Sequence, residues 1–244
     1  EKGSYIIYRR ISHNYYYLFF FFFTQERHPS RFFHCIVMKI FVAGLNHNTA
    51  DVEVREKVAF NESRLDEGLR RFRELAEIEE AMILSTCNRV ELYAHVNDTQ
   101  RASESVKDFL SEFHHINRAL LDKAIYTHDG VDAIRHIFRV ASSLDSMVVG
   151  EPQILGQLKE AFEKALEKKT TGILLNRLMK KAISVAKRVR SETKIAENAV
   201  SISFAAVELA KKIFADLSGR VFMLLGAGEM AELAARHLMS NGVK

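Results

Sequence analysis

Residues 83–96 read "ILSTCNRVELYAHV" and place one cysteine between two runs that have the pattern of β-strands. Residues 81–85 form a short apolar run, and residues 90–96 form an alternating one. Three polar residues, Thr86, Asn88 and Arg89, interrupt the apolar pattern around Cys87. The stretch therefore predicts two strands joined by a polar loop, with the cysteine in the loop rather than in the interior.

The elements on either side predict an α+β domain. A buried strand is expected at residues 39–45, followed by an amphipathic helix over residues 61–80 that Asn61 caps. A second amphipathic helix is expected near residues 102–115, and a shorter strand or loop around "KAIYTHD". This order predicts an antiparallel sheet with helices on one side.

The pattern from residue 129 to residue 214 is almost wholly helical. Asp129 is placed to cap a helix, and Pro152, which follows Glu151, suits the first turn of the next one. Helical periods continue through residues 173–190 and 199–214. The α+β domain is thus expected to end in a helical segment.

The total charge of the chain says little about its binding partners. The formal net charge is +4, but residues 1–37 hold five basic and two acidic side chains, so the remainder is close to neutral. The two cysteines, Cys35 and Cys87, form no C-x-x-C pair, so neither a metal site nor a disulfide framework is expected. A reducing, cytoplasmic compartment is the simpler interpretation.

Residues 1–37 differ in character from the rest. They contain "YYYLFFFFF", an apolar block of nine residues that is well short of a bilayer span. No small-residue cleavage site follows it. We interpret the segment as upstream sequence that was read through in frame before a natural start at Met38, with a targeting peptide as the alternative. We expect no membrane association.

A glycine-rich turn follows the helical segment. The stretch "VFMLLGAGEMA" is a strand pattern that leads into a G-x-G-x-x-A dinucleotide fingerprint and a helix. A helix N-terminus at this place favours a pyrophosphate. The position that separates NAD from NADP lies at or beyond residue 244. The candidate cofactor-binding residues are Gly226, Ala227, Gly228, Glu229, Met230 and Ala231.

Cys87 has two interpretations on chemistry alone. A single cysteine beside a strand is often a small core side chain. Its polar neighbours favour a nucleophile instead, because Arg89 and a nearby helix N-terminus would lower the pKa of the thiol. Combined with a dinucleotide site, such a nucleophile suggests reduction of a thioester.

Three motifs carry a resemblance to a known family. "GLNHNTADVEVREKVAF", "STCNRVELY" and "LDSMVVGEPQILGQLKEAF" resemble the glutamyl-tRNA reductases, in the family's order. The resemblance implies NADPH-dependent reduction of glutamyl-tRNA(Glu) to glutamate-1-semialdehyde through a cysteine thioester, the first step of tetrapyrrole synthesis. It also implies a homodimer joined through a further helical domain, and it suggests the downstream aminomutase as a partner.

The resemblance implies roles for individual residues. Cys87 matches the catalytic cysteine, and His136 matches an activity-sensitive histidine with an acid/base or positioning role, for which His47 competes. The residues that match the family's substrate pocket are Thr86, Asn88, Arg89, Ser146, Glu151, Pro152, Gln153 and Gln157.

Two further expectations concern tRNA and the domains. Residues 163–194 hold ten basic and three acidic side chains, either a solvated helix face or a surface for tRNA phosphates. We expect a catalytic domain at residues 38–192, then a linking helix and the truncated start of an α/β Rossmann-type NADP-binding domain at 193–244. The alternatives are a shikimate-dehydrogenase-like oxidoreductase and a tRNA-binding regulatory module.

Overall fold

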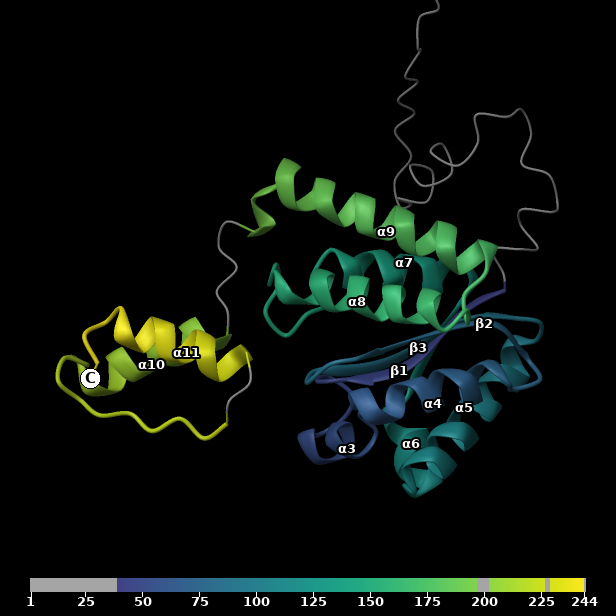
Figure 1. Cartoon of the computed structure of the whole chain (residues 1–244), viewed down its shortest axis with the longest axis horizontal. Coiled ribbons are helices and arrows are strands. Elements are labelled where there is room, and N and C mark those ends of the chain that lie inside the picture. Colours follow the sequence, from purple (N-terminus) through teal and green to yellow (C-terminus); the bar gives the residue numbers. More distant parts are fainter. Residues whose placement is uncertain (1–38, 197–201, 227–228, 244) are drawn as a thin grey trace, which may run out of the picture. The chain divides into compact units, whose positions relative to one another are not determined.

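The computed structural model describes residues 39–196, 202–226 and 229–243 (Figure 1). The upstream segment that we set apart in the sequence, residues 1–37, lies outside the described residues. In the described ranges, every helix is too short or too polar to cross a membrane.

Residues 39–196 are built around one sheet. Their elements follow in the order β1 Ile40–Asn46, α3 Val52–Lys57, α4 Glu62–Arg73, β2 Ile78–Ser85, β3 Arg89–Val96, α5 Thr99–His114, α6 Arg118–Ala124, β4 Tyr126–Asp129, α7 Gly130–Ala141, α8 Gln153–Glu167, α9 Ile173–Glu192 and the 3-10 turn η1 Lys194–Ala196. The mixed α+β class with an antiparallel sheet is confirmed.

The sheet has the strand order β2-β3-β1-β4, and its neighbouring strands are antiparallel. β2 and β3 form the hairpin that the opening stretch predicted, with the cysteine in its turn. Thr86 closes that turn, because its Oγ1 accepts hydrogen bonds from the backbone N–H of Asn88 at 3.2 Å and of Arg89 at 3.1 Å. The turn therefore ends where the side chain of Arg89 enters the interior.

The two helices predicted together with the strands, α4 and α5, lie on one side of the sheet, as expected, and the helices of the later segment cover the other face. Figure 1 shows α4 and α5 below the strands and α7, α8 and α9 above them. All seven residues of β1 are buried. A strand with both faces covered is apolar on both, so its sequence does not show which helices will pack on it.

Several boundaries differ from the sequence prediction. The helix predicted over residues 61–80 ends at Arg73, and β2 begins at Ile78. The Asn61 cap is confirmed, since its side chain accepts from Arg64 N. Asp129 occupies the cap position of α7 without a side-chain hydrogen bond there. The short helices α3 and α6 were not predicted, because six or seven residues show too little of a helical period.

Because α4 ends at Arg73, Glu80 lies in β2 rather than in the predicted helix. Its buried carboxylate accepts from the backbone N–H of Gly172 at 2.9 Å, Leu174 at 3.0 Å and Leu175 at 2.7 Å. These are N–H groups at the start of α9, which have no partner inside the helix. Glu80 therefore caps α9 from a strand, and this cap fixes the helix against the sheet.

Residues 202–243 contain the helices α10 Ile202–Phe214 and α11 Glu229–Met239. Val207, Leu217 and Leu238 form a small core there. The strand predicted at residues 221–226 is not formed among the described residues, and the side chain of Leu225 is 87% exposed. A strand exists only where a neighbour completes its hydrogen bonds, and no described strand pairs with this segment.

Candidate functional site

A narrow pocket lies beside Cys87, between the β2–β3 turn and the segment that leads into α8. Its volume is about 10 Å³, close to the least that one water molecule requires. A larger ligand therefore enters only if the walls move. The pocket is lined by Thr86, Cys87, Asn88, Arg89, Ser146, Met147, Glu151, Gln153, Ile154 and Gln157.

Most of the predicted substrate residues meet in this pocket. The motif around Cys87 contributes three of them, beside Cys87 itself, and the motif that contains Ser146 contributes the others. Pro152 lies at the N-cap position of α8 and is not among the lining residues, although it joins Glu151 to Gln153. The predicted histidine, His136, does not line the pocket either.

The Cys87 turn is held by three parts of the chain. Thr86 closes it from within, as described above. The backbone N–H of His47, in the loop after β1, donates to Asn88 O at 3.0 Å. Arg55, on α3, donates from Nη1 to Cys87 O at 2.9 Å and to Asn88 Oδ1 at 3.2 Å. The backbone of an exposed cysteine is thereby fixed by neighbours on both sides.

The thiol of Cys87 is not activated in the way that the sequence suggested. Desolvation of the sulfur among the pocket walls raises its pKa, and the negative charge of Glu151 raises the pKa further. The charge that acts in the opposite direction is that of Arg55. The expectation that Arg89 lowers the thiol pKa was wrong, because the charge of Arg89 is engaged elsewhere.

Arg89 is almost fully buried beneath the pocket, with 1% of its surface exposed. Its Nη1 donates to Glu91 Oε1 at 2.6 Å, and its Nη2 donates to the backbone oxygen of Asp145 and lies 3.2 Å from Asp145 Oδ2. Two carboxylates therefore share its charge. These contacts tie the turn on β3 to the loop that carries Ser146.

Glu91 is the centre of this buried network. Burial acts to raise the pKa of its carboxyl, but Arg89 and the hydrogen bonds of His136 and Tyr126 hold that pKa well below the ordinary range. Tyr93 OH and Tyr126 OH both donate to the carboxylate. The same burial and the Glu91 charge raise the pKa of Tyr126. Glu91 is thus an acceptor that stays ionised.

His136 belongs to the network rather than to the pocket. It is buried on α7, and its Nε2 lies 2.9 Å from Glu91 Oε1. Its ring also packs against that of His128, with centroids 4.7 Å apart. His136 therefore reaches the pocket through Glu91 and Arg89.

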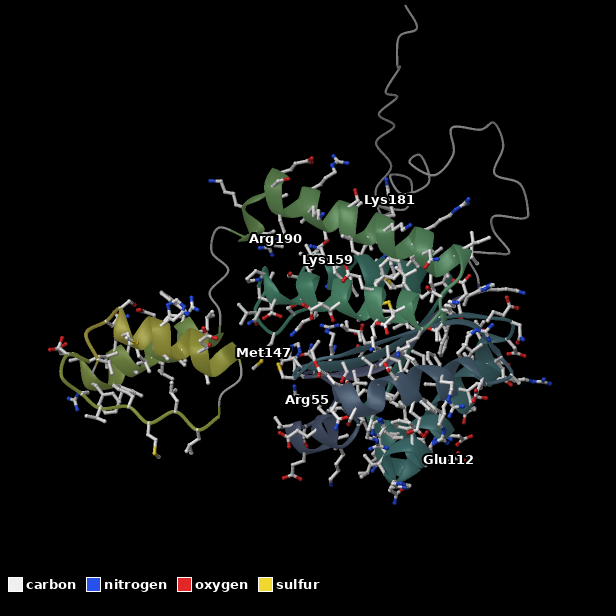
Figure 2. All side chains as sticks on the ribbon, in the orientation of Figure 1. Arg55, Glu112, Met147, Lys159, Lys181 and Arg190 are labelled. Atoms are coloured by element: carbon white, nitrogen blue, oxygen red, sulfur yellow. The ribbon has the colours of Figure 1, made fainter. Side chains whose placement is uncertain are left out.

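The loop before α8 forms the other wall. Ser143 Oγ donates to Glu151 O at 2.7 Å, and Gly150, with a φ of 87°, donates to Ser143 O at 2.9 Å. Arg190, near the end of α9, donates to both Gly150 O and Glu151 O at 3.2 Å. In Figure 2 the labelled Arg190, Met147 and Arg55 lie toward the same end of the sheet.

Ser146 has an unsatisfied hydroxyl in this wall. The residue is 8% exposed, and its Oγ makes no hydrogen bond within the described part of the chain. Buried polar atoms in proteins almost always have a partner, so one without a partner in a pocket is suited to a ligand.

Sequence reasoning missed four residues of this site. Glu91 could have been found, because Arg89, Glu91 and Tyr93 are polar at every second position of an otherwise apolar strand. Met147 and Ile154 lie in the same motif as the predicted polar residues, but their apolar side chains gave no sign of a place in the pocket. Arg55 gave no local signal, since it is one of several charges in the segment of α3.

A second cavity lies at the other edge of the sheet. It is larger, with a volume of about 330 Å³, but its walls hold no cysteine. We place the candidate functional site at Cys87 because the exposed thiol and the unsatisfied hydroxyl of Ser146 occur there. The larger cavity is lined by Phe41, Thr99, Gln100, Ser103, Thr127, His128, Asp129 and Asp132.

The predicted cofactor motif is described in part. Gly226 has a φ of 115°, and no atom occupies the space where a Cβ would stand. Helix α11 begins three residues later, at Glu229. The glycine and the following helix N-terminus are two parts of a dinucleotide turn; the preceding strand, its third part, is not formed among the described residues. Ala227 and Gly228 lie outside the described residues; Glu229, Met230 and Ala231 belong to the first turn of α11.

Comparison with known proteins agrees with the geometry of the site. The sequence model of the family "Glutamyl-tRNAGlu reductase, N-terminal domain" matches residues 43–193, which include every residue of the Cys87 pocket. The chain belongs to the glutamyl-tRNA reductase family. A second family model, "Shikimate / quinate 5-dehydrogenase", matches residues 208–244.

Relatives in the family are similar over most of this chain. It is 58% identical over 207 residues to the glutamyl-tRNA reductase of Geobacter metallireducens and 57% identical to that of Geobacter sulfurreducens. Each match covers 85% of this chain and 48% of the relative, so the chain spans about half the length of these proteins. The solved glutamyl-tRNA reductase from Methanopyrus kandleri is 37% identical, with a TM-score of 0.60 and the same coverage.

Proposed function

We propose that this chain carries the substrate-binding and acyl-transfer part of a glutamyl-tRNA reductase. The full reaction is the NADPH-dependent reduction of glutamyl-tRNA(Glu) to glutamate-1-semialdehyde, the first step of tetrapyrrole synthesis. One observation supports it above the others: a single pocket joins the exposed thiol of Cys87 to the buried, unsatisfied hydroxyl of Ser146. The pocket suits acyl transfer to sulfur.

The proposed acyl transfer takes place between the Cys87 thiol and the ester bond of glutamyl-tRNA. The Cys87 sulfur attacks the carbonyl carbon of the glutamyl ester, and a C–S bond forms as the bond to the ribose oxygen breaks. The thiol proton ends on the released ribose hydroxyl. The glutamyl group is then held as a thioester on Cys87, inside a pocket that leaves little room for water.

The pocket walls supply complementary groups for a glutamyl moiety. Glu151 is placed to pair with the α-ammonium group, and Gln153 and Gln157 offer neutral hydrogen bonds. Thr86, Asn88 and Arg89 contact the remainder, with the guanidinium of Arg89 held in place by Glu91 and Asp145. Glu91 in turn is bound by His136, so we assign His136 a positioning role. His47 touches the same turn through its backbone.

Reduction requires a dinucleotide site, for which the Gly226 turn and the start of α11 are the candidates in this chain. When bound, NADPH supplies the hydride that converts the thioester to an aldehyde and releases the Cys87 thiolate. We propose the catalytic part at residues 38–192 and the linking helix and start of the NADP-binding part at residues 193–244.

The proposed partners follow from the substrate. Exposed cations on α9, Arg177, Lys180 and Lys187, provide a surface for tRNA phosphates, which would add affinity without sequence specificity. We propose that the full-length enzyme is a homodimer in the cytoplasm and passes its product to the aminomutase.

The test is to incubate the 244-residue chain with glutamyl-tRNA labelled in the glutamate. We expect acid-stable label on Cys87 that hydroxylamine releases, and none on Cys87→Ser. A tRNA-binding module would bind charged and uncharged tRNA equally and leave Cys87 unlabelled. A shikimate-dehydrogenase-like enzyme would reduce NADP with shikimate and also leave it unlabelled. Either result overturns the proposal.

A further inference from the structure

Arg55 is a buried cation without a carboxylate partner. Its residue is 9% exposed, and it forms no salt bridge with any Asp or Glu in the described ranges. Its Nε is buried and makes no hydrogen bond there. Buried charges are normally paired, since removing an ion from water is costly. Stability alone is therefore a poor reason for this arrangement.

Within the described part of the chain, the hydrogen bonds of Arg55 go to the Cys87 turn. Its Nη1 lies 2.9 Å from Cys87 O and 3.2 Å from Asn88 Oδ1. These acceptors are neutral, so within the described ranges no carboxylate pairs with the positive charge that contacts the backbone of Cys87. Arg89, by contrast, shares its charge with Glu91 and Asp145. Of the two arginines, the one on α3 is the one that can act on a thiolate at Cys87.

We propose that Arg55 is the positioning residue of the nucleophile, which holds the Cys87 turn against α3 and brings to that turn a positive charge that no described carboxylate pairs. The inference rests on the proposed function only in naming Cys87 as the nucleophile. It assigns to a residue on α3 the two tasks that a cysteine nucleophile needs, a fixed backbone and a stabilised anion.

Three other groups face the same turn. Glu151, before α8, opposes Arg55 in its effect on the thiol. His47, in the loop after β1, has its pKa lowered by burial and by Arg89 and Arg55, so it stays neutral near pH 7. Asp145 pairs with Arg89 and acts on His47 in the opposite sense. Arg55 is thus the cation that directly contacts the turn at Cys87.

The test compares Arg55→Met and Arg55→Lys with Lys57→Met, which removes a charge from an exposed position of the same helix. All variants carry Cys35→Ser, so that Cys87 is the remaining thiol. Alkylation by iodoacetamide is measured from about pH 7 to about pH 11.5, because burial raises the pKa of the Cys87 thiol above its ordinary value. We expect Arg55→Met to react about 5- to 10-fold more slowly near pH 7.5, with its midpoint at higher pH and an unchanged plateau. Arg55→Lys should restore part of the rate, and Lys57→Met should equal the parent.

Two results would overturn the inference. The first is faster alkylation of Arg55→Met, which would mean that the turn merely opened and exposed the sulfur. The second is a pH profile of alkylation for Arg55→Met that equals the profile of the parent. If Arg55→Met does not fold, as circular dichroism would show, the comparison of Arg55→Lys with the parent decides: a shift of the midpoint supports the inference, and identical profiles oppose it.

A separate assay keeps this inference distinct from the proposed function. Transfer of labelled glutamate to Cys87 is measured for the parent and for Arg55→Lys. A parent that alkylates normally but accepts no glutamate contradicts the function, and the pH profiles still decide the role of Arg55. A parent that accepts glutamate, with Arg55→Lys transferring it at an undiminished rate, contradicts the role of Arg55.

Discussion

Arg89 Nη1 lies 2.6 Å from Glu91 Oε1, and both side chains are buried under the pocket that contains Cys87. The two residues stand two positions apart on β3 and so point to the same face of the strand. Arg89 lines the pocket, and Glu91 contacts His136 and two tyrosines. The floor of the site is therefore a charged network rather than an apolar core.

Glu91→Gln should destabilise the protein by about 2–4 kcal/mol, because it leaves a buried arginine with a single, partly exposed carboxylate. Urea unfolding measures the change. The matched control is Glu79→Gln, which removes the half-exposed carboxylate that pairs with His95 and should change stability by less than about 1 kcal/mol. Equal losses of stability in Glu91→Gln and Glu79→Gln would show that the buried Arg89–Glu91 pair contributes no more than an exposed pair.

The same substitution has a defined pH dependence. The carboxyl of Glu91 has a pKa held well below its ordinary value of 4.5, so its contribution is fully present above about that pH and is lost as the pH falls further. The difference in stability between the parent and Glu91→Gln should therefore be constant near neutral pH and should shrink in acid. A difference that grows on acidification would contradict the ionised network.

Cys87→Ser should abolish transfer of glutamate from glutamyl-tRNA, because a hydroxyl without a base is a far weaker nucleophile than a thiolate. The exposed position of Cys87 predicts an unchanged melting temperature, measured by circular dichroism. Cys35→Ser is the matched control and should keep full transfer. Transfer by Cys87→Ser within a few-fold of the parent would remove this cysteine from the mechanism.

Glu151→Gln should affect the thiol and the substrate in opposite directions. Loss of its negative charge lowers the pKa of Cys87, so iodoacetamide should alkylate Cys87 several-fold faster near pH 7.5. Loss of the partner for the substrate ammonium should slow transfer of glutamate. Glu160→Gln, at an exposed position of α8, should change neither rate. Slower alkylation of Glu151→Gln would contradict the assigned charge effect.

Glu80→Gln should weaken the attachment of α9 to the sheet. An amide has one acceptor oxygen where the carboxylate uses two for three backbone donors, so we expect a loss of about 1–3 kcal/mol in urea unfolding. Hydrogen exchange should become faster at Leu174 and Leu175 in particular. Unchanged exchange at these two amides would mean that the cap contributes little.

Features that depend on near neighbours along the chain were predictable from the sequence. The β2–β3 hairpin follows from two apolar runs around a polar turn, and that turn is closed by Thr86 only two and three residues away. The cap of α4 by Asn61 is equally local. The motif residues around Cys87 and from Ser146 to Gln157 also follow from the sequence, because each motif is short and contiguous.

The tertiary structure alone decided which distant residues serve that turn. Arg55 reaches Cys87 across 32 positions, Arg89 reaches Asp145 across 56, and Glu80 reaches Leu175 across 95. It also decided that helices cover both faces of the sheet and that residues 221–226, without a neighbouring strand, form no strand of their own. Periodicity reports the faces of a single element, whereas the partner of a buried charge depends on which elements pack together. The candidate nucleophile was therefore visible in the sequence, and the cation that contacts its turn was not.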